Sequence, residues 1–122
     1  MSSRVHAVTF DCRNAAGLAA FWAGALGGRI LDGAAEQWAM LEGPAGVGHL
    51  LFLQVPAAKG TKNRCHVDLA TDDPAAEVER LVGLGATVVH EKDEWGVHWF
   101  TLQDPEGNEF CVAGHPPAGE PA

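Results

Sequence analysis

RCHVDLATDD, residues 64–73, is the stretch that decides the fold. Its residues alternate between apolar and polar side chains, which is the pattern of a strand with one buried face. One face carries Val67, Leu69 and Thr71, and the other carries His66, Asp68, Ala70 and Asp72. An acidic residue followed by Pro74 is typical of the first turn of a helix. The stretch therefore predicts a half-buried strand that leads directly into a helix, with His66 on the polar face.

The chain before this stretch contains the same succession of elements. Residues 4–12 alternate like a strand, and Asn14 can cap a helix whose apolar side chains recur every three or four residues. Gly27 and Gly28 are expected to end this helix. Short strands are expected over three segments, residues 29–31, 37–41 and 49–55. Residues 4–55 thus form one module of a strand, a helix and three strands.

The succession is repeated after the stretch. A helix is expected over 75–84, ended by Gly85, and strands are expected over 86–91, 97–103 and 109–113. Residues 64–114 form the second module, residues 56–63 form a polar linker, and residues 115–122 form a disordered tail. We therefore predict one α+β domain over residues 1–122, built from two βαβββ modules. Helices cover one face of the curved mixed sheet, and the other face is left as a cup-shaped cavity for a ligand.

Composition excludes several classes of partner. The chain has 122 residues and a formal net charge of −8. Such a charge disfavours binding to nucleic acid or to an anionic membrane surface. The three cysteines cannot all pair within one chain, and no secretory signal or membrane-spanning segment is apparent. These features predict a soluble protein of the reducing cytoplasm.

Several short motifs resemble the vicinal oxygen chelate superfamily. They are residues 66–73, the Leu-Gly-Ala of residues 84–86 and the Asp-Pro-Glu-Gly-Asn-Glu-Phe of residues 104–110. Residues 10–12, 21–22, 63–66 and 108–111 are more narrowly similar to the glyoxalase-like domain proteins grouped beside the bleomycin-resistance proteins. The resemblance covers nearly the whole chain. It implies a cup formed by two βαβββ modules, with any divalent metal at the base and substrate oxygens completing its coordination.

In metal-dependent members, the resemblance places ligands on the first and last strands of each module. In the first module these positions fall on Ala7, which cannot coordinate, and on the inward face predicted for Phe52 and Gln54. His6 lies beside Ala7 and should point to the other face. The amide oxygen of Gln54 is a weak partner for a transition metal.

The second module offers better groups. His66 matches a ligand position, and Cys111 falls where a glutamate is usual, with Glu109 two residues earlier on the same face. We therefore predict His66 and Glu109 as catalytic residues and as candidate ligands of a divalent metal such as zinc, nickel, manganese or iron. Alternatively, without a metal, His66 and Asp68 line a polar cup, in which His66 can act as a general base.

A substrate pocket is expected to share this surface. Tryptophans on strand faces can either pack the core or form the wall of a pocket for a flat organic ligand. The residues predicted to line the pocket are Thr9, Trp38, Met40, Phe52, Gln54, Asp68, Trp99, Thr101 and Cys111.

Two functions follow from this set. The first is a glyoxalase-like enzyme, with lyase or isomerase chemistry on a small carbonyl compound. The second is a metal-independent protein that sequesters an antibiotic or a similar small molecule, as bleomycin-resistance proteins do. The resemblance also implies a homodimer. The linker is long enough to connect two modules that form a cup within one chain, or to exchange modules so that two chains share the cup.

Overall fold

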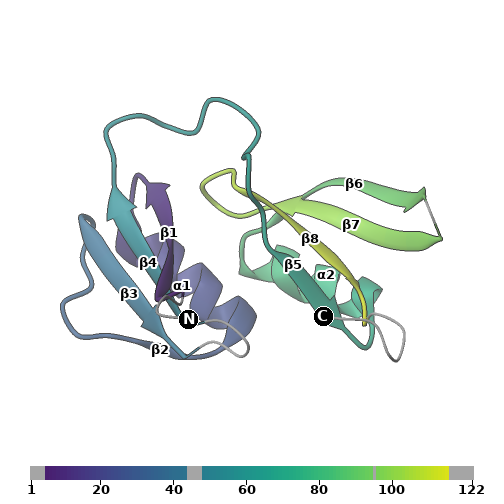
Figure 1. Cartoon of the computed structure of the whole chain (residues 1–122), viewed down its shortest axis with the longest axis horizontal. Coiled ribbons are helices and arrows are strands. Elements are labelled where there is room, and N and C mark those ends of the chain that lie inside the picture. The colour runs from purple at the N-terminus through teal and green to yellow at the C-terminus, as the bar shows by residue number, and fades with distance from the viewer. Residues whose placement is uncertain (1–4, 44–47, 95, 116–122) are drawn as a thin grey trace. The chain divides into compact units, whose positions relative to one another are not determined.

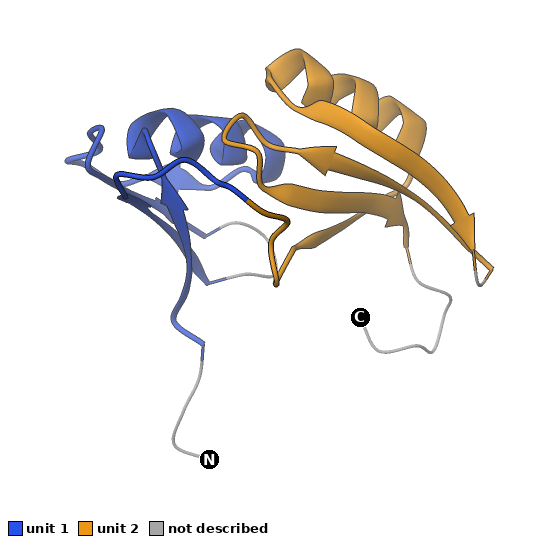
Figure 2. Ribbon diagram, turned by 90° about the horizontal axis from the view of Figure 1, so that it is seen from above, with its two compact units in different colours: residues 1–60 blue, residues 61–122 orange. Residues whose placement is uncertain are grey.

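The computed structural model describes residues 5–43, 48–94 and 96–115. The chain divides into two compact units, residues 1–60 and residues 61–122, coloured separately in Figure 2. The boundary lies inside the segment predicted to be a linker.

Unit 1 contains one helix and a four-stranded sheet (Figure 1). Its elements are β1 (Ala7–Cys12), α1 (Ala15–Leu26), β2 (Arg29–Ile30), β3 (Trp38–Glu42) and β4 (His49–Gln54). The strand order is β1-β4-β3-β2, with β1 parallel to β4 and the other pairs antiparallel. A parallel pair needs a crossover connection, and α1 begins that connection from β1 to β4.

Aromatic packing joins α1 to its sheet. The side chain of Asn14 accepts a hydrogen bond from the backbone N–H of Gly17, as the cap predicted from the sequence requires. Trp22 of α1 is buried, and its ring lies 5.5 Å from that of Phe10, which in turn lies 5.3 Å from the ring of Phe52. The helix-facing side of the sheet is therefore the core of unit 1.

This packing corrects the orientation predicted for Phe52 and Gln54. Phe52 is completely buried on the helix side, so the prediction that it lines a ligand pocket is wrong. The amide of Gln54 donates to the backbone oxygen of Arg13 and to Glu36 Oε1 near the start of α1. Both sides of residues 49–55 are apolar, so alternation alone does not identify the buried face.

Unit 2 repeats the succession (Figure 1). Its elements are β5 (Asp68–Thr71), α2 (Pro74–Leu84), β6 (Thr87–Glu94), β7 (Val97–Gln103) and β8 (Glu109–Gly114). The strand order is β5-β8-β7-β6, with β5 parallel to β8 and the other pairs antiparallel. The predicted α+β class and the two βαβββ modules are thus confirmed.

The core of unit 2 lies between α2 and the sheet. The Asp73 side chain caps α2 by accepting from the N–H of Ala76. Val78 and Leu81 of α2 are buried, as are the sheet residues Leu102, Phe110 and Val112. The opposite face of this sheet is not covered by α2, and it carries the polar side chains described below.

Two strand boundaries differ from the sequence prediction. The strand expected from Arg64 begins only at Asp68, so His66 precedes β5. The strand expected over 86–91 continues to Glu94 and contains a bulge between Val88 and His90. Within the described residues, no helix is both long and apolar enough to cross a membrane.

Candidate functional site

A row of four polar side chains crosses the uncovered face of the unit 2 sheet. Asp68 of β5 is paired with Cys111 of β8, Cys111 with Thr101 of β7, and Thr101 with His90 of β6. Side chains at paired positions lie on the same face of a sheet. Residues far apart in the sequence are therefore brought into one line, and the strand ladder determines their spacing.

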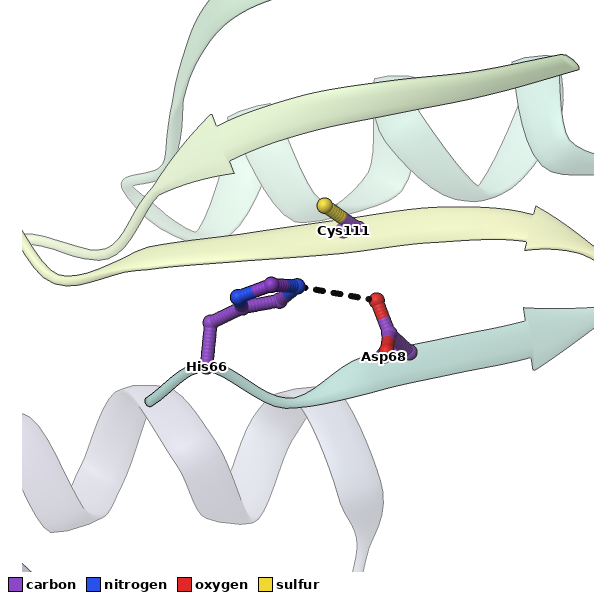
Figure 3. A group of neighbouring side chains, drawn as sticks. All are labelled: His66, Asp68 and Cys111. Atoms are coloured by element: carbon purple, nitrogen blue, oxygen red, sulfur yellow. Dashed lines mark ion pairs between the residues drawn. The ribbon is translucent and has the colours of Figure 1, made fainter. Parts of the chain in front are cut away.

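His66, Asp68 and Cys111 form the closest group in this region (Figure 3). One imidazole nitrogen, one carboxylate oxygen and the sulfur all lie within 4.8 Å of one another. His66 Nε2 is 3.4 Å from Asp68 Oδ1, and both side chains are partly exposed. An imidazole, a carboxylate and a thiol thus converge at a point that a ligand can reach.

The surroundings of Cys111 favour the protonated thiol over the thiolate. Burial raises the pKa of the Cys111 thiol above its ordinary value. The hydroxyl of Thr101, 3.5 Å from the sulfur, opposes this rise in pKa, as does the positive charge of Lys62. The negative charge of Asp68 adds to it. An unassisted nucleophilic attack by Cys111 at neutral pH is therefore disfavoured, since the thiolate is the reactive form.

Glu109 has a different environment from the one predicted for it. Its Oε1 accepts the backbone N–H of Asn63 at 2.9 Å, and its Oε2 accepts Gln103 Nε2 at 3.3 Å. The Asn63 carboxamide in turn accepts the backbone N–H of Glu109 and donates to its carbonyl oxygen. Both carboxylate oxygens of Glu109 are thus engaged by protein groups.

These contacts hold the segment that carries His66. Asn63 Nδ2 also donates to the carbonyl oxygen of Cys65, the residue before His66. We call Asn63 and Glu109 the clamp. The side chain of Asn63 forms hydrogen bonds with the backbone of Glu109. Two residues further along β8, the N–H of Cys111 donates to the carbonyl oxygen of Val67. The clamp therefore replaces strand pairing at the point where β5 was predicted to begin.

A hollow of about 500 Å³ opens over the row. It is lined by Lys62, His66, Asp68, Leu69, His90, Val97, Trp99, Thr101, Glu109, Cys111 and Ala113. Six residues predicted for the site from the sequence are brought together here: His66, Asp68, Trp99, Thr101, Glu109 and Cys111.

Lys62 and His90 line the hollow and are absent from the set predicted from the sequence. Lys62 lies in the segment that was interpreted as a linker. His90 is exposed on β6, an edge strand of the sheet, where it pairs with Thr101 of β7. The register of β6 and β7 runs from the pairing of Glu94 with Val97 back to the pairing of His90 with Thr101, and this register determines that His90 belongs to the row.

Other predicted pocket residues lie in unit 1. Thr9 and Met40 both pair with Leu51, and Trp38 pairs with Leu53, on the sheet face away from the buried Phe52. They share a surface of unit 1 and do not belong to the hollow of unit 2.

The donor set of the closest group fits a divalent transition metal. Zinc is held by His nitrogen at about 2.0–2.1 Å and by Cys sulfur at about 2.3 Å, so that its ligand atoms lie roughly 3–4 Å apart. The atoms of His66, Asp68 and Cys111 lie within 4.8 Å of one another and need only small movements to reach that spacing. A thiol among the donors favours zinc over magnesium or calcium.

The profile of the glyoxalase-like domain family matches residues 7–113. The chain belongs to the glyoxalase-like domain family. The match includes both modules and every residue that lines the hollow. It confirms the resemblance inferred from the sequence motifs. The chain matches no curated protein sequence.

Solved structures show the same fold at low sequence identity. A glyoxalase/bleomycin resistance protein/dioxygenase family enzyme from Burkholderia phytofirmans has a TM-score of 0.71 and 19% identity, with 92% of this chain and 98% of that one covered. The fosfomycin resistance protein FosX from Listeria monocytogenes, solved with Mn(II) and a dihydroxypropylphosphonic acid, has a TM-score of 0.74, 14% identity, and coverage of 94% and 93%. FosX from Mesorhizobium loti has a TM-score of 0.69, 15% identity, and coverage of 95% and 94%.

Proposed function

We propose that this protein is an enzyme acting on a small carbonyl compound, by lyase or isomerase chemistry, in the hollow of unit 2. The observation that carries the proposal is the convergence of His66, Asp68 and Cys111 within 4.8 Å on one side of this hollow. Three different donor groups at the edge of a ligand-sized hollow are typical of a catalytic metal site with an open position.

Each of the three residues has a distinct part in the proposal. Asp68, whose Oδ1 lies 3.4 Å from His66 Nε2, supplies a carboxylate donor beside the imidazole donor of His66. Cys111 supplies the soft donor, and it releases its proton when it coordinates. When bound here, a divalent ion supplies Lewis-acid polarisation of a substrate oxygen. In the absence of an ion, His66 can accept a proton from a substrate directly.

We infer that Glu109 positions the backbone that carries His66. Its carboxylate oxygens accept hydrogen bonds from Asn63 and Gln103, which lowers its availability as a base. Through Asn63 it holds the backbone that leads to His66.

The metal part of the proposal is tested by thermal-shift titration of reduced protein with zinc, nickel and manganese salts. A ligand present at a hundredfold excess over its Kd stabilises the folded state by about 2.7 kcal/mol, which raises Tm measurably. We expect this rise for the natural sequence and its loss in His66→Ala and Asp68→Asn.

His98→Gln is the matched control. His98 also lies close to two carboxylates, 2.7 Å from Glu91 and 3.8 Å from Asp93, but does not line the hollow. The control should retain the whole shift. An equal loss in all three variants, or no shift for any metal, would contradict the proposed site.

A second candidate function is sequestration of a small molecule without turnover. The apolar wall of the hollow, formed by Val97, Trp99 and Ala113, favours it. Incubating a panel of carbonyl compounds with the metal-loaded protein separates the two functions. Conversion of a compound supports the enzyme, whereas tight binding with complete recovery of unchanged compound supports sequestration.

The proposal includes a homodimer in the reducing cytoplasm. The resemblance to the superfamily supports the dimer, and the three free cysteines suit a reducing compartment. Sedimentation equilibrium of the purified protein should give about twice the mass of 12.8 kDa.

A further inference from the structure

The row of polar side chains in unit 2 ends on a histidine that the proposed metal site does not use. His90 of β6 pairs with Thr101 of β7, and Thr101 pairs with Cys111 of β8. Paired residues of antiparallel strands have Cα atoms about 4.5–5.5 Å apart, so the Cα atoms of His90 and Cys111 are roughly 9–11 Å apart. Both residues line the hollow. His90 therefore faces the proposed metal site from two strands away, across the width of a small ligand.

His90 offers a basic nitrogen to the hollow. Its imidazole is exposed and forms no hydrogen bond or ion pair with the residues that the structure describes. A neutral imidazole has one nitrogen that can accept a proton, whereas the ammonium group of Lys62 has donors only. Both carboxylate oxygens of Glu109 are already engaged, by Asn63 and Gln103. Outside the proposed metal site, His90 is thus the lining residue best able to remove a proton from a ligand.

The charges that line the hollow favour an uncharged ligand. Asp68 and Glu109 carry carboxylates, and Lys62 is the one lysine or arginine among the lining residues. An anionic group on the ligand would meet both carboxylates. A hydroxyl group can donate to a carboxylate, and a carbonyl oxygen can accept from Lys62. The lining is therefore suited to a small neutral compound that carries hydroxyl and carbonyl oxygens.

We propose that His90 is the general base that removes a proton from the carbon beside the carbonyl group of an uncharged α-hydroxy ketone or α-hydroxy aldehyde. The carbonyl oxygen faces His66 and Lys62, and the carbon-bound hydrogen faces His90. The C–H bond breaks, its proton passes to the imidazole, and its electron pair forms a C=C bond as the carbonyl oxygen gains the negative charge. Lys62 offsets that charge. This inference rests on the proposed function, because it assigns a base and a substrate class to the same site.

Hydrogen exchange in D2O tests the proposal. The protonated His90 exchanges its proton with the solvent, so return of the proton to the same carbon leaves deuterium there. Hydroxyacetone and dihydroxyacetone are incubated with zinc-supplemented protein, and the protons between the carbonyl and hydroxyl groups are followed by NMR. We expect exchange above the rate with zinc alone, and a fall of about 10²–10⁴-fold in His90→Gln, which is the usual contribution of a positioned base. Unchanged exchange in His90→Gln, or no exchange of either compound above the zinc control, would overturn the proposal.

His98→Gln is the matched control for His90. His98 is also an exposed histidine of the hairpin formed by β6 and β7, but it does not line the hollow. The control should exchange at the natural rate, and an equal loss in both variants would overturn the assignment to His90. Dihydroxyacetone phosphate, which adds negative charge to the same reacting carbons, should exchange more slowly than dihydroxyacetone. Equal or faster exchange of the phosphate would overturn the uncharged substrate class.

Zinc binding separates this inference from the proposed function. His90→Gln should retain the zinc-induced rise in Tm, because His66, Asp68 and Cys111 are unaltered. Loss of exchange in His66→Ala but not in His90→Gln would refute this inference and leave the proposed function standing. No zinc-induced rise in the natural sequence would refute the proposed metal site, whereas exchange that still depends on His90 would support the base.

Discussion

Cys111 combines two properties that determine what the site can do. It lines the hollow, and burial raises the pKa of its thiol, which therefore stays protonated at neutral pH. A metal ion can displace the proton of the thiol when it binds. A weak electrophile reacts only slowly, because the protonated thiol is a poor nucleophile. The residue thus fits a role as a ligand better than a role as a nucleophile.

Alkylation rates should separate the three cysteines. Cys65 is exposed, Cys111 is half-buried with a raised pKa, and Cys12 is buried with 3% exposure. We expect iodoacetamide to modify Cys65 first, Cys111 more slowly and Cys12 only on unfolding, as followed by mass spectrometry of proteolytic peptides. The rate at Cys111 should rise with pH above neutrality, because the thiolate fraction rises. A rate at Cys111 that equals or exceeds that at Cys65 would contradict the protonated thiol.

The clamp makes a second prediction at the residue scale. Asn63→Ala removes the side-chain bonds to the backbone of Glu109 and to the carbonyl oxygen of Cys65. We expect a loss of about 1–3 kcal/mol in the free energy of unfolding, measured with urea. Zinc affinity should fall too, because His66 is no longer held.

Asn14→Ala is the matched control for the clamp. It removes a helix cap in unit 1 at a cost of about 1 kcal/mol and should leave zinc affinity unchanged. If the two variants lower zinc affinity equally, the clamp does not position His66.

At the scale of single elements, α2 offers a pH-dependent contact. Arg80 Nε and one of its terminal nitrogens each lie 2.7 Å from a carboxylate oxygen of Glu77. The side-chain hydrogen bond from Arg80 lowers the pKa of Glu77 from its ordinary 4.5. A lowered pKa in the folded state stabilises the protein above that ordinary value, and this contribution is lost as pH falls through the folded pKa.

Glu77→Gln should therefore destabilise the protein by about 0.3–0.5 kcal/mol at pH 7. The difference from the natural sequence should shrink as the pH is lowered below 4.5, as measured by urea unfolding at several pH values. Glu79→Gln, an exposed change on the same helix that also removes one negative charge, is the matched control. A difference that grows toward acidic pH would show that the sign is wrong.

A substitution in β4 tests whether Phe52 lies on the buried, helix-facing side of the sheet. Phe52 is completely buried and packs on Phe10, so Phe52→Ala should cost about 3–5 kcal/mol in the free energy of unfolding. Measured at low temperature, where the variant is still folded, zinc binding should be unchanged. If the variant kept its stability but bound ligand more weakly, Phe52 would line the pocket and would not belong to the core.

The elements also show what the sequence could reveal. Alternation did not by itself determine the faces of β7 and β8, and Cys111 was placed by the family resemblance; Trp99, Thr101 and Cys111 do share one face. It failed for Phe52, because apolar residues occupy both sides of β4. Alternation also placed the start of β5 too early, at Arg64. The clamp that replaces strand pairing there joins residues 46 apart in the chain, so no local sequence pattern marks the true start of the strand.

At the scale of the whole chain, the internal repeat was the most informative feature. It predicted two βαβββ modules, and the structure confirms them. Among the residues that the structure describes, a group of three side chains with the spacing to hold a metal ion occurs only in unit 2. The corresponding surface of unit 1 carries Thr9, Trp38 and Met40, together with Glu42 and His49, whose side chains lie 3.7 Å apart. The two copies of one module have therefore diverged in chemistry while keeping the same fold.

Titration of the reduced protein with cobalt(II), followed by absorption spectroscopy, tests the central claim most directly. The absorption spectrum of bound cobalt(II) depends on its ligands. A thiolate ligand gives an intense near-ultraviolet charge-transfer band, and tetrahedral coordination gives strong visible bands. We predict both for the natural sequence at one ion per chain, with the charge-transfer band absent in Cys111→Ser but retained in Cys65→Ser. A natural protein without the thiolate band, or one that loses it in Cys65→Ser instead, would contradict the assignment of His66, Asp68 and Cys111 as the metal site.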